Sequence, residues 1–546
     1  MTSVSSTTAP PAATPRPPKP EACRDPQSTA GSEHAREHHE RERHFETRHL
    51  LDDLEGKSVR GGTVVAVSQL CRLVLQMGST MVLARLLTPG DFGLVAMVTA
   101  VTGFVFMFKE AGLSMATVQR AEINHAQVST LFWINVGISV VLLLVTAALG
   151  PVIAWFFHEP RLVGITLALA GTVVLAGLTI QHQALLRRQM RFTALARIDI
   201  ASMALGIAAA IGLAWYGAGF WALVAMPIVT SVANVALVWS LCDWRPGLPR
   251  RHCGVRPMLG FGGHLTGFNF VNYFIRNLDN LLIGRVWGAL QLGWYTKAYG
   301  LLLLPLAQIN GPVAAVAVPG LSRLQNDPQR FRRYYLRGLS LITFITMPLT
   351  ALLIVEADDV VAVILGRQWT GATGIFRLLA ISALVQPVCN AAGWLLTSRG
   401  RTDKLFKWGL FASVFIVAGF LIGLPFGARG VALGYAVAML ALTPPCLWYA
   451  TRGTPVTVKN MLVAMRDPAV ATLVGTAAVL GYGMGTPAAA PTIRLFTAAL
   501  LMSVTYLIVL RYVLRRGGTM DGLVRQMMRR RAIVPTGGEW SGERQP

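Results

Sequence analysis

Charged residues are scarce in this sequence: Asp, Glu, Lys and Arg together make up 14% of its 546 residues. Soluble proteins carry about 25% charged residues, whereas 53% of this chain is hydrophobic and its mean hydropathy is +0.51. Among the charged residues the acidic ones are the rarer, with 26 Asp and Glu against 49 Lys and Arg. The low charge excludes an ordinary soluble globular protein and indicates a chain that lies largely in lipid.

Several chemical signatures are also missing. The six cysteines have no CxxC spacing, so neither a disulfide framework nor a zinc site is expected. The sequence contains no P-loop and no HExxH motif, and no stretch long enough for a soluble catalytic domain separates its apolar runs. We therefore expect no enzyme activity and no cofactor. The first 57 residues lack the apolar core of a signal peptide, and the His-rich run within them is interpreted as a solvated tail.

Apolar runs of about twenty residues predict an all-α polytopic membrane protein with about fourteen transmembrane helices. The expected helices lie near 61–87, 92–115, 129–157, 160–183, 197–217, 219–241, 258–286, 289–320, 334–356, 371–397, 404–424, 427–450, 467–487 and 491–513. The expected parts of the chain are a disordered tail 1–57, a lobe 58–241, a linker 242–257, a second lobe 258–450, two further helices 467–513 and a basic tail 514–546.

The positive charge predicts the orientation. Lys and Arg cluster in alternate connections, as in Arg187, Arg188 and Arg191, while the intervening connections carry about one each. By the positive-inside rule the linker, both tails and both termini are cytoplasmic. The net charge of +23 then has anionic membrane lipids as its partner, and no nucleic acid is expected.

A polar stripe occurs twice inside these apolar segments. The residues of the first stripe are Gln69, Arg72, Gln76, Ser79 and Thr80, and those of the second are Asn269, Asn272, Arg276, Asp279 and Asn280. At about 100° per residue each set covers about a third of its helix. An arginine in mid-membrane costs about 2.5–3.5 kcal/mol on insertion scales, so we expect both stripes to face a hydrated cavity. The alternative is that the stripes hydrogen-bond to each other in a packed bundle.

The stripes belong to an internal repeat. An offset of 200 residues aligns Gly62 with Gly262, Arg85 with Arg285 and Gly93 with Gly293, and an offset of 210 aligns LLRRQMR (185–191) with LLTSRGR (395–401). An even number of helices separates the copies, so both have the same orientation in the membrane. The sequence therefore predicts two six-helix lobes related by a parallel pseudo-two-fold repeat, with two extra C-terminal helices, and alternating access by rocking of the lobes.

The chain also resembles a known family. The motifs are DFGLVAMVTAVTGF (91–104), GLSMATVQR (112–120), STLFWINVGISVVLLL (129–144), QHQALLRRQMRF (181–192) and GFWALV (219–224). Together they are similar to Wzx-type oligosaccharide flippases of the polysaccharide transporter family, in the multidrug/oligosaccharidyl-lipid/polysaccharide exporter superfamily, of the colanic-acid and teichuronic-acid type. The similarity is strongest over about 58–400. One departure is Lys109-Glu110 where the family pattern has an acidic DLG-like element.

The resemblance implies a flippase that moves a polyprenyl-pyrophosphate-linked oligosaccharide repeat unit across the plasma membrane for surface polysaccharide synthesis. Its implied partners are this lipid-linked oligosaccharide and, as candidates, the polysaccharide polymerase and export machinery. A pyrophosphate crossing the membrane needs cations. The candidate cations are Arg72, Arg276, Lys297, Lys109 and Arg377, and for the last three snorkelling to headgroups is an equal alternative.

Neutral and acidic residues complete the expected site. The candidates for sugar contacts are Gln69, Gln76, Asn269, Asn272 and Asn280, and the candidates for ion coupling are Asp279, Glu110 and Asp199. An alternative role for Asp279 is to neutralise Arg276. An alternative role for Asp199 is to pair with the cytoplasmic arginines. Two other functions stay open: an ion-coupled drug or small-molecule antiporter on the same fold, and a membrane-embedded polymerase or glycosyltransferase. An acid-lined cavity would favour the antiporter, and a large extramembrane domain would favour the enzyme.

Overall fold

The structure is a computed structural model of the whole chain. It describes residues 54–108, 114, 117–118, 123–249, 256–485 and 490–513. Within these ranges only the backbone is described for 54–60, 106–108, 256–272, 274–276 and 513. Throughout the described ranges the regular elements are helices, and no strand occurs among them.

The helices follow the predicted apolar segments closely. Their bounds are α2 (Leu54–Leu86), α3 (Pro89–Phe108), α5 (His125–Phe157), α6 (Arg161–Arg188), α7 (Phe192–Trp215), α8 (Phe220–Leu241), α9 (Arg256–Arg323), α10 (Pro328–Val355), α11 (Ala357–Ile364), α12 (Thr370–Thr397), α13 (Thr402–Gly423), α14 (Gly427–Thr451), α15 (Val458–Gly485) and α16 (Pro491–Ile508). Short 3-10 turns, η2 (Arg367–Trp369) and η3 (Leu424–Phe426), precede α12 and α14, and the π-helical turn η4 (Val509–Val513) follows α16.

Local sequence explains several helix boundaries. Asn124 caps α5 by accepting a hydrogen bond from the backbone of Gln127, whose side chain accepts one in return. The hydroxyl of Thr88 donates to Asp91 at 2.6 Å ahead of α3, where Pro89 occupies the first helical position. Gly288 has a φ of 77°, so it divides α9 into two helices.

Among the residues that the structure describes, eleven helical stretches are long and apolar enough to cross a membrane. The stretch Asn277–Arg323 contains the kink at Gly288, the stretch Thr402–Thr451 contains η3, and Pro89–Val105 is a shorter apolar helix. The multi-pass helical prediction is therefore confirmed, while the number fourteen stays a prediction because merged stretches are counted once.

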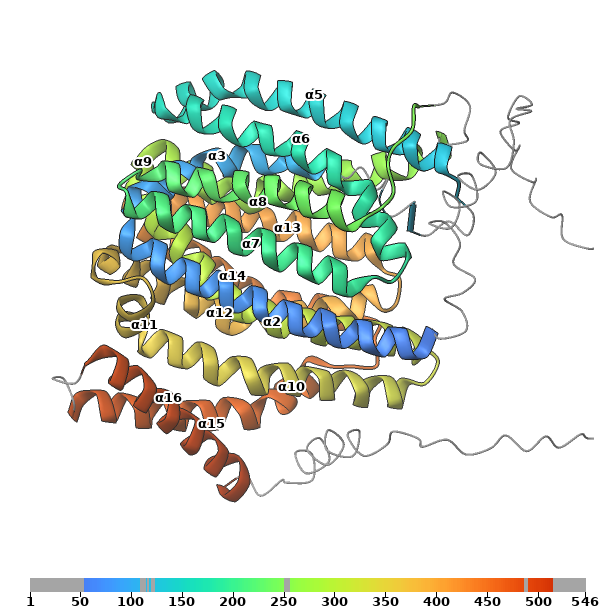
Figure 1. The fold of residues 1–546 in the computed structure, drawn as a ribbon. Coiled ribbons are helices and arrows are strands. Elements are labelled where there is room, and N and C mark those ends of the chain that lie inside the picture. Colours follow the sequence, from blue (N-terminus) through green and yellow to red (C-terminus); the bar gives the residue numbers. More distant parts are fainter. Residues whose placement is uncertain are drawn as a thin grey trace, which may run out of the picture.

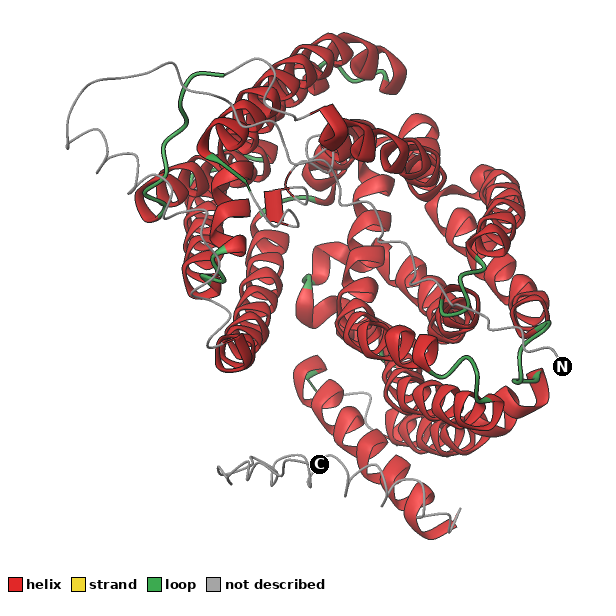
Figure 2. Ribbon diagram, turned by 90° about the vertical axis from the view of Figure 1, so that its right-hand side faces the viewer, coloured by secondary structure: helices red, strands yellow, loops and turns green. Residues whose placement is uncertain are grey.

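The packing of the helices repeats along the chain. In the first lobe, α2 to α8, α5 packs along α6, α6 along α8, and α7 along α8. In the second lobe, α9 to α14, α10 packs along α12, α12 along α14, and α13 along α14. The two lobes thus share one packing order, as the internal repeat predicts. Figure 1 shows α15 and α16 beside α10, outside both lobes, and Figure 2 shows most of the helices nearly end-on. The exact domain boundaries stay predictions.

The lobes meet where α3 crosses α9. A Cβ atom added to Gly93 would overlap the carbonyl oxygen of Ala289, and one added to Gly293 would overlap that of Pro89. The contact is reciprocal, because residues 93 and 293, like residues 89 and 289, are 200 positions apart. Only glycine allows backbones to approach so closely. We call this crossing the glycine contact.

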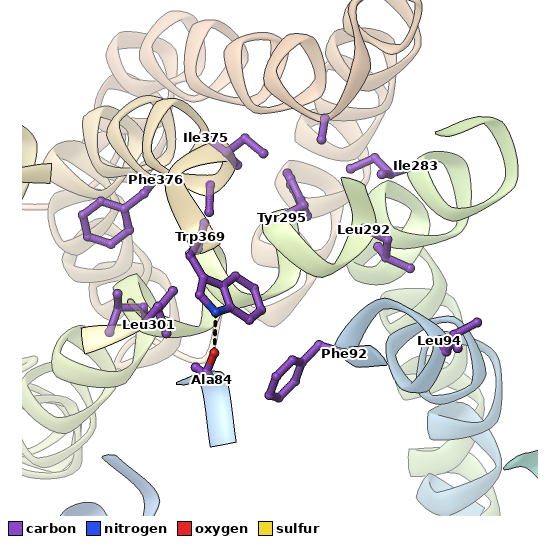
Figure 3. Close-up of a cluster of buried hydrophobic side chains, with 14 of the residues drawn as sticks. Ala84, Phe92, Leu94, Ile283, Leu292, Tyr295, Leu301, Trp369, Ile375 and Phe376 are labelled. Carbon is purple, nitrogen blue, oxygen red and sulfur yellow. Dashed lines mark hydrogen bonds between the residues drawn. The ribbon is translucent and has the colours of Figure 1, made fainter. Parts of the chain in front are cut away.

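An apolar cluster surrounds the glycine contact and is drawn from both lobes. Figure 3 shows Ala84 and Phe92 of the first lobe facing Leu292 and Trp369 of the second. The indole N–H of Trp369 donates to the carbonyl oxygen of Ala84 at 2.7 Å, and its ring meets Phe92 edge-on with 5.4 Å between centroids. Burial of these side chains seals one end of the interface between the lobes.

A methyl group at the glycine contact should separate the lobes. In Gly93→Ala or Gly293→Ala the new Cβ has no room beside the opposing backbone, so we expect a longer distance between spin labels placed at Leu86→Cys and Arg367→Cys. These two exposed positions lie in different lobes, beside the hydrogen bonds from Gln368 to the carbonyl oxygens of Ala84 and Leu87. Double electron–electron resonance on the purified protein, with native cysteines replaced, measures this distance.

Gly171→Ala is the matched control, since a Cβ added there meets nothing within 4 Å. An unchanged distance in both contact variants, with the control also unchanged, would show that the crossing tolerates side chains and does not set the separation of the lobes.

Candidate functional site

A pocket of about 510 Å³ lies between the lobes, next to the glycine contact. Its walls come from α2, α3 and α8 of the first lobe and from the second half of α9. Gln76 and Thr80 of the first polar stripe line it, whereas Gln69 and Arg72 do not. The rest of the wall is mostly apolar, with Lys297 as the charged exception.

Lys297 projects into this pocket from α9. Its ammonium nitrogen lies 4.0 Å from the centroid of the Phe92 ring, which is a cation–π distance across the two lobes. Within the described part of the chain no carboxylate lies within ion-pair distance of it. The pocket therefore offers a cation whose described partner is an aromatic face, and an aromatic face satisfies a cation less well than an anion does.

Arg72 lies one helical turn from Gln76 on α2. Its guanidinium is 3.5 Å from the carboxylate of Asp199 on α7, and both side chains are almost half exposed, at 49% and 43%. Asp199 therefore pairs with an arginine of the first stripe, which the spacing of residues along one helix could not reveal. Gln69, one turn further along α2, is exposed.

Asp279 occupies a different place. It is 4% exposed and accepts a hydrogen bond of 2.8 Å from the hydroxyl of Tyr295. It lines a second pocket of about 820 Å³ inside the second lobe, between α9, α12, α13 and α14. Asn280 follows it with a buried side-chain oxygen that has no hydrogen-bond partner in the described structure. The structure thus separates these two residues from Gln76 and Lys297.

Arg377 does not line either of the two described pockets. Its guanidinium donates to the carboxylate of Asp358 at 2.6 Å and to the carbonyl oxygen of Ile354 at 3.3 Å. An ion pair beyond the end of α10 accounts for this arginine, so neither a pocket cation nor a snorkelling side chain is needed to explain it.

Five predicted site residues cannot be placed. Lys109 and Glu110 lie outside the described residues, and for Arg276, Asn269 and Asn272 the described structure ends at the backbone. Their roles stay predictions. Among the described residues, no group of three or more His, Cys, Asp or Glu side chains is placed to hold a metal ion.

The sequence reasoning missed several pocket residues. Phe92 and Thr99 of α3 and Thr296 of α9 line the pocket between the lobes, and Trp408 and Tyr449 line the second pocket. Phe92 lies in a family-like motif, which was a usable signal, whereas the aromatic residues of the second pocket come from separate helices and leave no pattern along the chain.

The two arginines aligned by the repeat close the end of the interface beside the glycine contact. Arg85 donates from the end of α2 to the carbonyl oxygen of Val363 at 2.8 Å, and Arg285 donates from α9 to Nδ1 of His158 at 2.9 Å. Each arginine therefore reaches into the other lobe. The pocket is capped at this end by side-chain and backbone contacts from both lobes.

Two solved transporter structures have a similar fold. The chain aligns with the lipid II flippase MurJ in an inward closed conformation with a TM-score of 0.66 and 14% identity, over 84% of this chain and 99% of that one. An inward-facing multidrug resistance MATE family transporter aligns with a TM-score of 0.56 and 16% identity, over 72% and 98%. The predicted fold class is thereby confirmed.

Related sequences belong to polysaccharide synthesis. The lipopolysaccharide biosynthesis protein WzxC of Escherichia coli is 28% identical over 399 residues, which are 71% of this chain and 80% of the relative. The teichuronic acid biosynthesis protein TuaB of Bacillus subtilis is 28% identical over 350 residues, or 64% and 72%. The model of the polysaccharide biosynthesis protein family matches residues 82–374, more than half of the chain. The resemblance drawn from the motifs is confirmed, and the chain belongs to the polysaccharide biosynthesis protein family.

Proposed function

We propose that this protein is a flippase that moves a polyprenyl-pyrophosphate-linked oligosaccharide across the plasma membrane by alternating access. The observation that carries the proposal is Lys297, a cation in a pocket between two lobes, facing an aromatic ring with no carboxylate beside it in the described structure. A pyrophosphate would supply the missing anion. The relatives' names in lipopolysaccharide and teichuronic acid synthesis, and the fold shared with a lipid II flippase, support this cargo.

The three parts of the cargo make different demands on the protein. The isoprenoid tail can stay in the bilayer, and the pyrophosphate needs cations with hydrogen-bond donors. Lys297 and Arg72 are the described cations proposed for it, and Arg276 and Lys109 are further candidates. Gln76 and the other predicted amides, Gln69, Asn269, Asn272 and Asn280, would contact sugar hydroxyls. The polymerase and export machinery would receive the cargo after transport.

The proposed orientation places both termini in the cytoplasm, because the basic connections lie at the end of the bundle opposite the glycine contact. The glycine contact would then close the outer end, and the cargo would reach the pocket from the cytoplasmic side. This arrangement suits the loading of a cargo that is assembled inside the cell.

Arg72 and Asp199 suggest how the cargo is taken up. A pyrophosphate carries more charge than a carboxylate and would compete with Asp199 for the guanidinium of Arg72. Loading would then free the Asp199 carboxylate, which makes it a candidate for coupling. Asp279, which lies in the second pocket with Tyr295, and Glu110 are the other candidates.

An ion-coupled drug antiporter is the second candidate function. The likeness to a multidrug resistance transporter and the buried carboxylate of Asp279 favour it. A drug cation would be repelled by Lys297 in the pocket between the lobes, so this function requires binding in the second pocket instead. Transport of a lipophilic cation that is unaffected by Lys297→Ala would support it.

Removing the charge of Lys297 should block transport of the lipid-linked glycan. We expect Lys297→Ala to slow the crossing by about tenfold or more, because a hydrogen bond between charged partners is worth about 1.5–3 kcal/mol. Lys297→Arg should retain part of the rate. The measurement is the crossing of a fluorescent polyprenyl-pyrophosphate oligosaccharide in vesicles reconstituted with purified protein.

Lys459→Ala is the control for loss of a lysine, since Lys459 is exposed on α15, outside both lobes. Wild-type crossing rates in Lys297→Ala, at equal protein per vesicle, would remove this lysine from the transport path.

Asp199→Asn should strengthen binding of undecaprenyl diphosphate, because it removes the carboxylate that competes for Arg72. A half-exposed ion pair is worth up to about 1 kcal/mol, so the dissociation constant should fall by up to about fivefold. Arg72→Ala should weaken binding. Both constants can be measured by titration of the purified protein in detergent. Equal affinities in the wild type and both variants would contradict the proposed exchange of partners.

A further inference from the structure

The two arginines that close the end beside the glycine contact are equivalent in the repeat but have unlike partners. Arg85 and Arg285 lie 200 positions apart. Arg85, at the end of α2, contacts Val363 on α11, which follows α10 in the second lobe. Arg285, on α9, contacts His158, which follows α5 in the first lobe. Arg85 donates to a backbone carbonyl, which does not titrate. Arg285 donates to an imidazole, which does.

The contact fixes the state of His158. A guanidinium has only donors, so Nδ1 of His158 must accept the hydrogen bond with a free lone pair. A proton on Nδ1 would remove this acceptor and place two cations 2.9 Å apart. The link between α9 and the connection from α5 to α6 can therefore form only while Nδ1 is unprotonated.

The groups around His158 leave its charge uncompensated. On its own connection Glu159 is held by Arg161 at 2.7 Å, and this hydrogen bond lowers the pKa of Glu159. On α3 the nearby Asp91 accepts hydrogen bonds from Thr88, and α8 begins with no charged residue in its first turn. Arg285 is the charged group that α9 presents to His158. The carboxylates near His158 are thus already engaged, and the facing group is a cation.

We propose that His158 is a proton-operated latch: uncharged, it accepts from Arg285 and holds the lobes closed beside the glycine contact, and protonated it releases Arg285 and lets that end open. Histidine is the protonatable side chain at this link, whereas a backbone carbonyl occupies the equivalent place in the Arg85 link. The use of this latch in transport rests on the proposed function. In the orientation proposed above, it would respond to protons outside the cell.

The geometry allows a substitution at residue 158 that keeps a hydrogen-bond acceptor for Arg285 but cannot be protonated. His158 ends α5 with a φ of 56°, in the left-handed region that asparagine tolerates well. The side-chain oxygen of asparagine lies about where Nδ1 lies and accepts hydrogen bonds at any pH. His158→Asn should therefore keep the link to Arg285 and lose only its response to pH.

The test uses the spin labels at Leu86→Cys and Arg367→Cys, which flank the other arginine link, in purified protein in lipid nanodiscs without any substrate. Between pH 7.5 and pH 5.5 the ratio of long to short distances should rise by up to about fivefold in the wild type, because a contact between exposed charged groups is worth up to about 1 kcal/mol. His158→Asn should stay closed at both values. Arg285→Ala should be open at both, and Arg85→Ala should open partly yet still respond to pH.

The outcomes decide the matter separately from glycan transport, because no cargo is present. A wild type that is closed at both pH values, or a His158→Asn variant that opens with acid as the wild type does, would overturn the latch. Failure of the vesicle transport assay with an intact pH response would instead refute the proposed cargo and leave the latch standing.

Discussion

The reciprocal approach of α3 and α9 is the constraint on which the rest of the structure depends. Gly93 lies against the backbone of Ala289 and Gly293 against that of Pro89, so neither position has room for a side chain. This contact sets how closely the lobes approach at one end, and the pocket with Lys297 and Phe92 lies beside it. The arginine links and the apolar cluster around Trp369 then reinforce a separation that glycine has already fixed.

The elements of the fold could be predicted from sequence because apolar length and capping act locally. The repeat was also visible, and it aligned Gly93 with Gly293 and Arg85 with Arg285 before their meaning was known. Equivalent residues near a pseudo-two-fold axis face the opposite lobe in the same way, so a repeat predicts reciprocal contacts wherever its residues lie close to the axis. The number of membrane helices was harder to establish, because Gly288 divides α9 without interrupting its apolar run.

The site could be predicted only in part, for a physical reason. Helical periodicity tells which residues share a face, and Gln76 and Thr80 of one stripe both line the pocket between the lobes. It carries no information on which face of another helix lies opposite. The pairing of Arg72 with Asp199, 127 positions away, and that of Arg377 with Asp358 therefore had to come from packing. The sequence favours Arg72 over Lys297 as a pyrophosphate-binding candidate. In the structure, however, Lys297 faces the ring of Phe92, while Arg72 is paired with the carboxylate of Asp199.

This division between two cations has a consequence for transport. A site that held a pyrophosphate with unopposed cations alone would bind it too firmly to release it, since a carrier must let its cargo go as readily as it takes it up. An arginine with a resident carboxylate binds an anion by exchange, and the carboxylate is available to displace the anion again. Lys297 would attract the headgroup into the pocket between the lobes, and the Arg72–Asp199 pair would keep the binding reversible. Two cations that each bind the pyrophosphate moderately, one of them with a carboxylate that competes for it, suit a flippase better than a single site of high affinity.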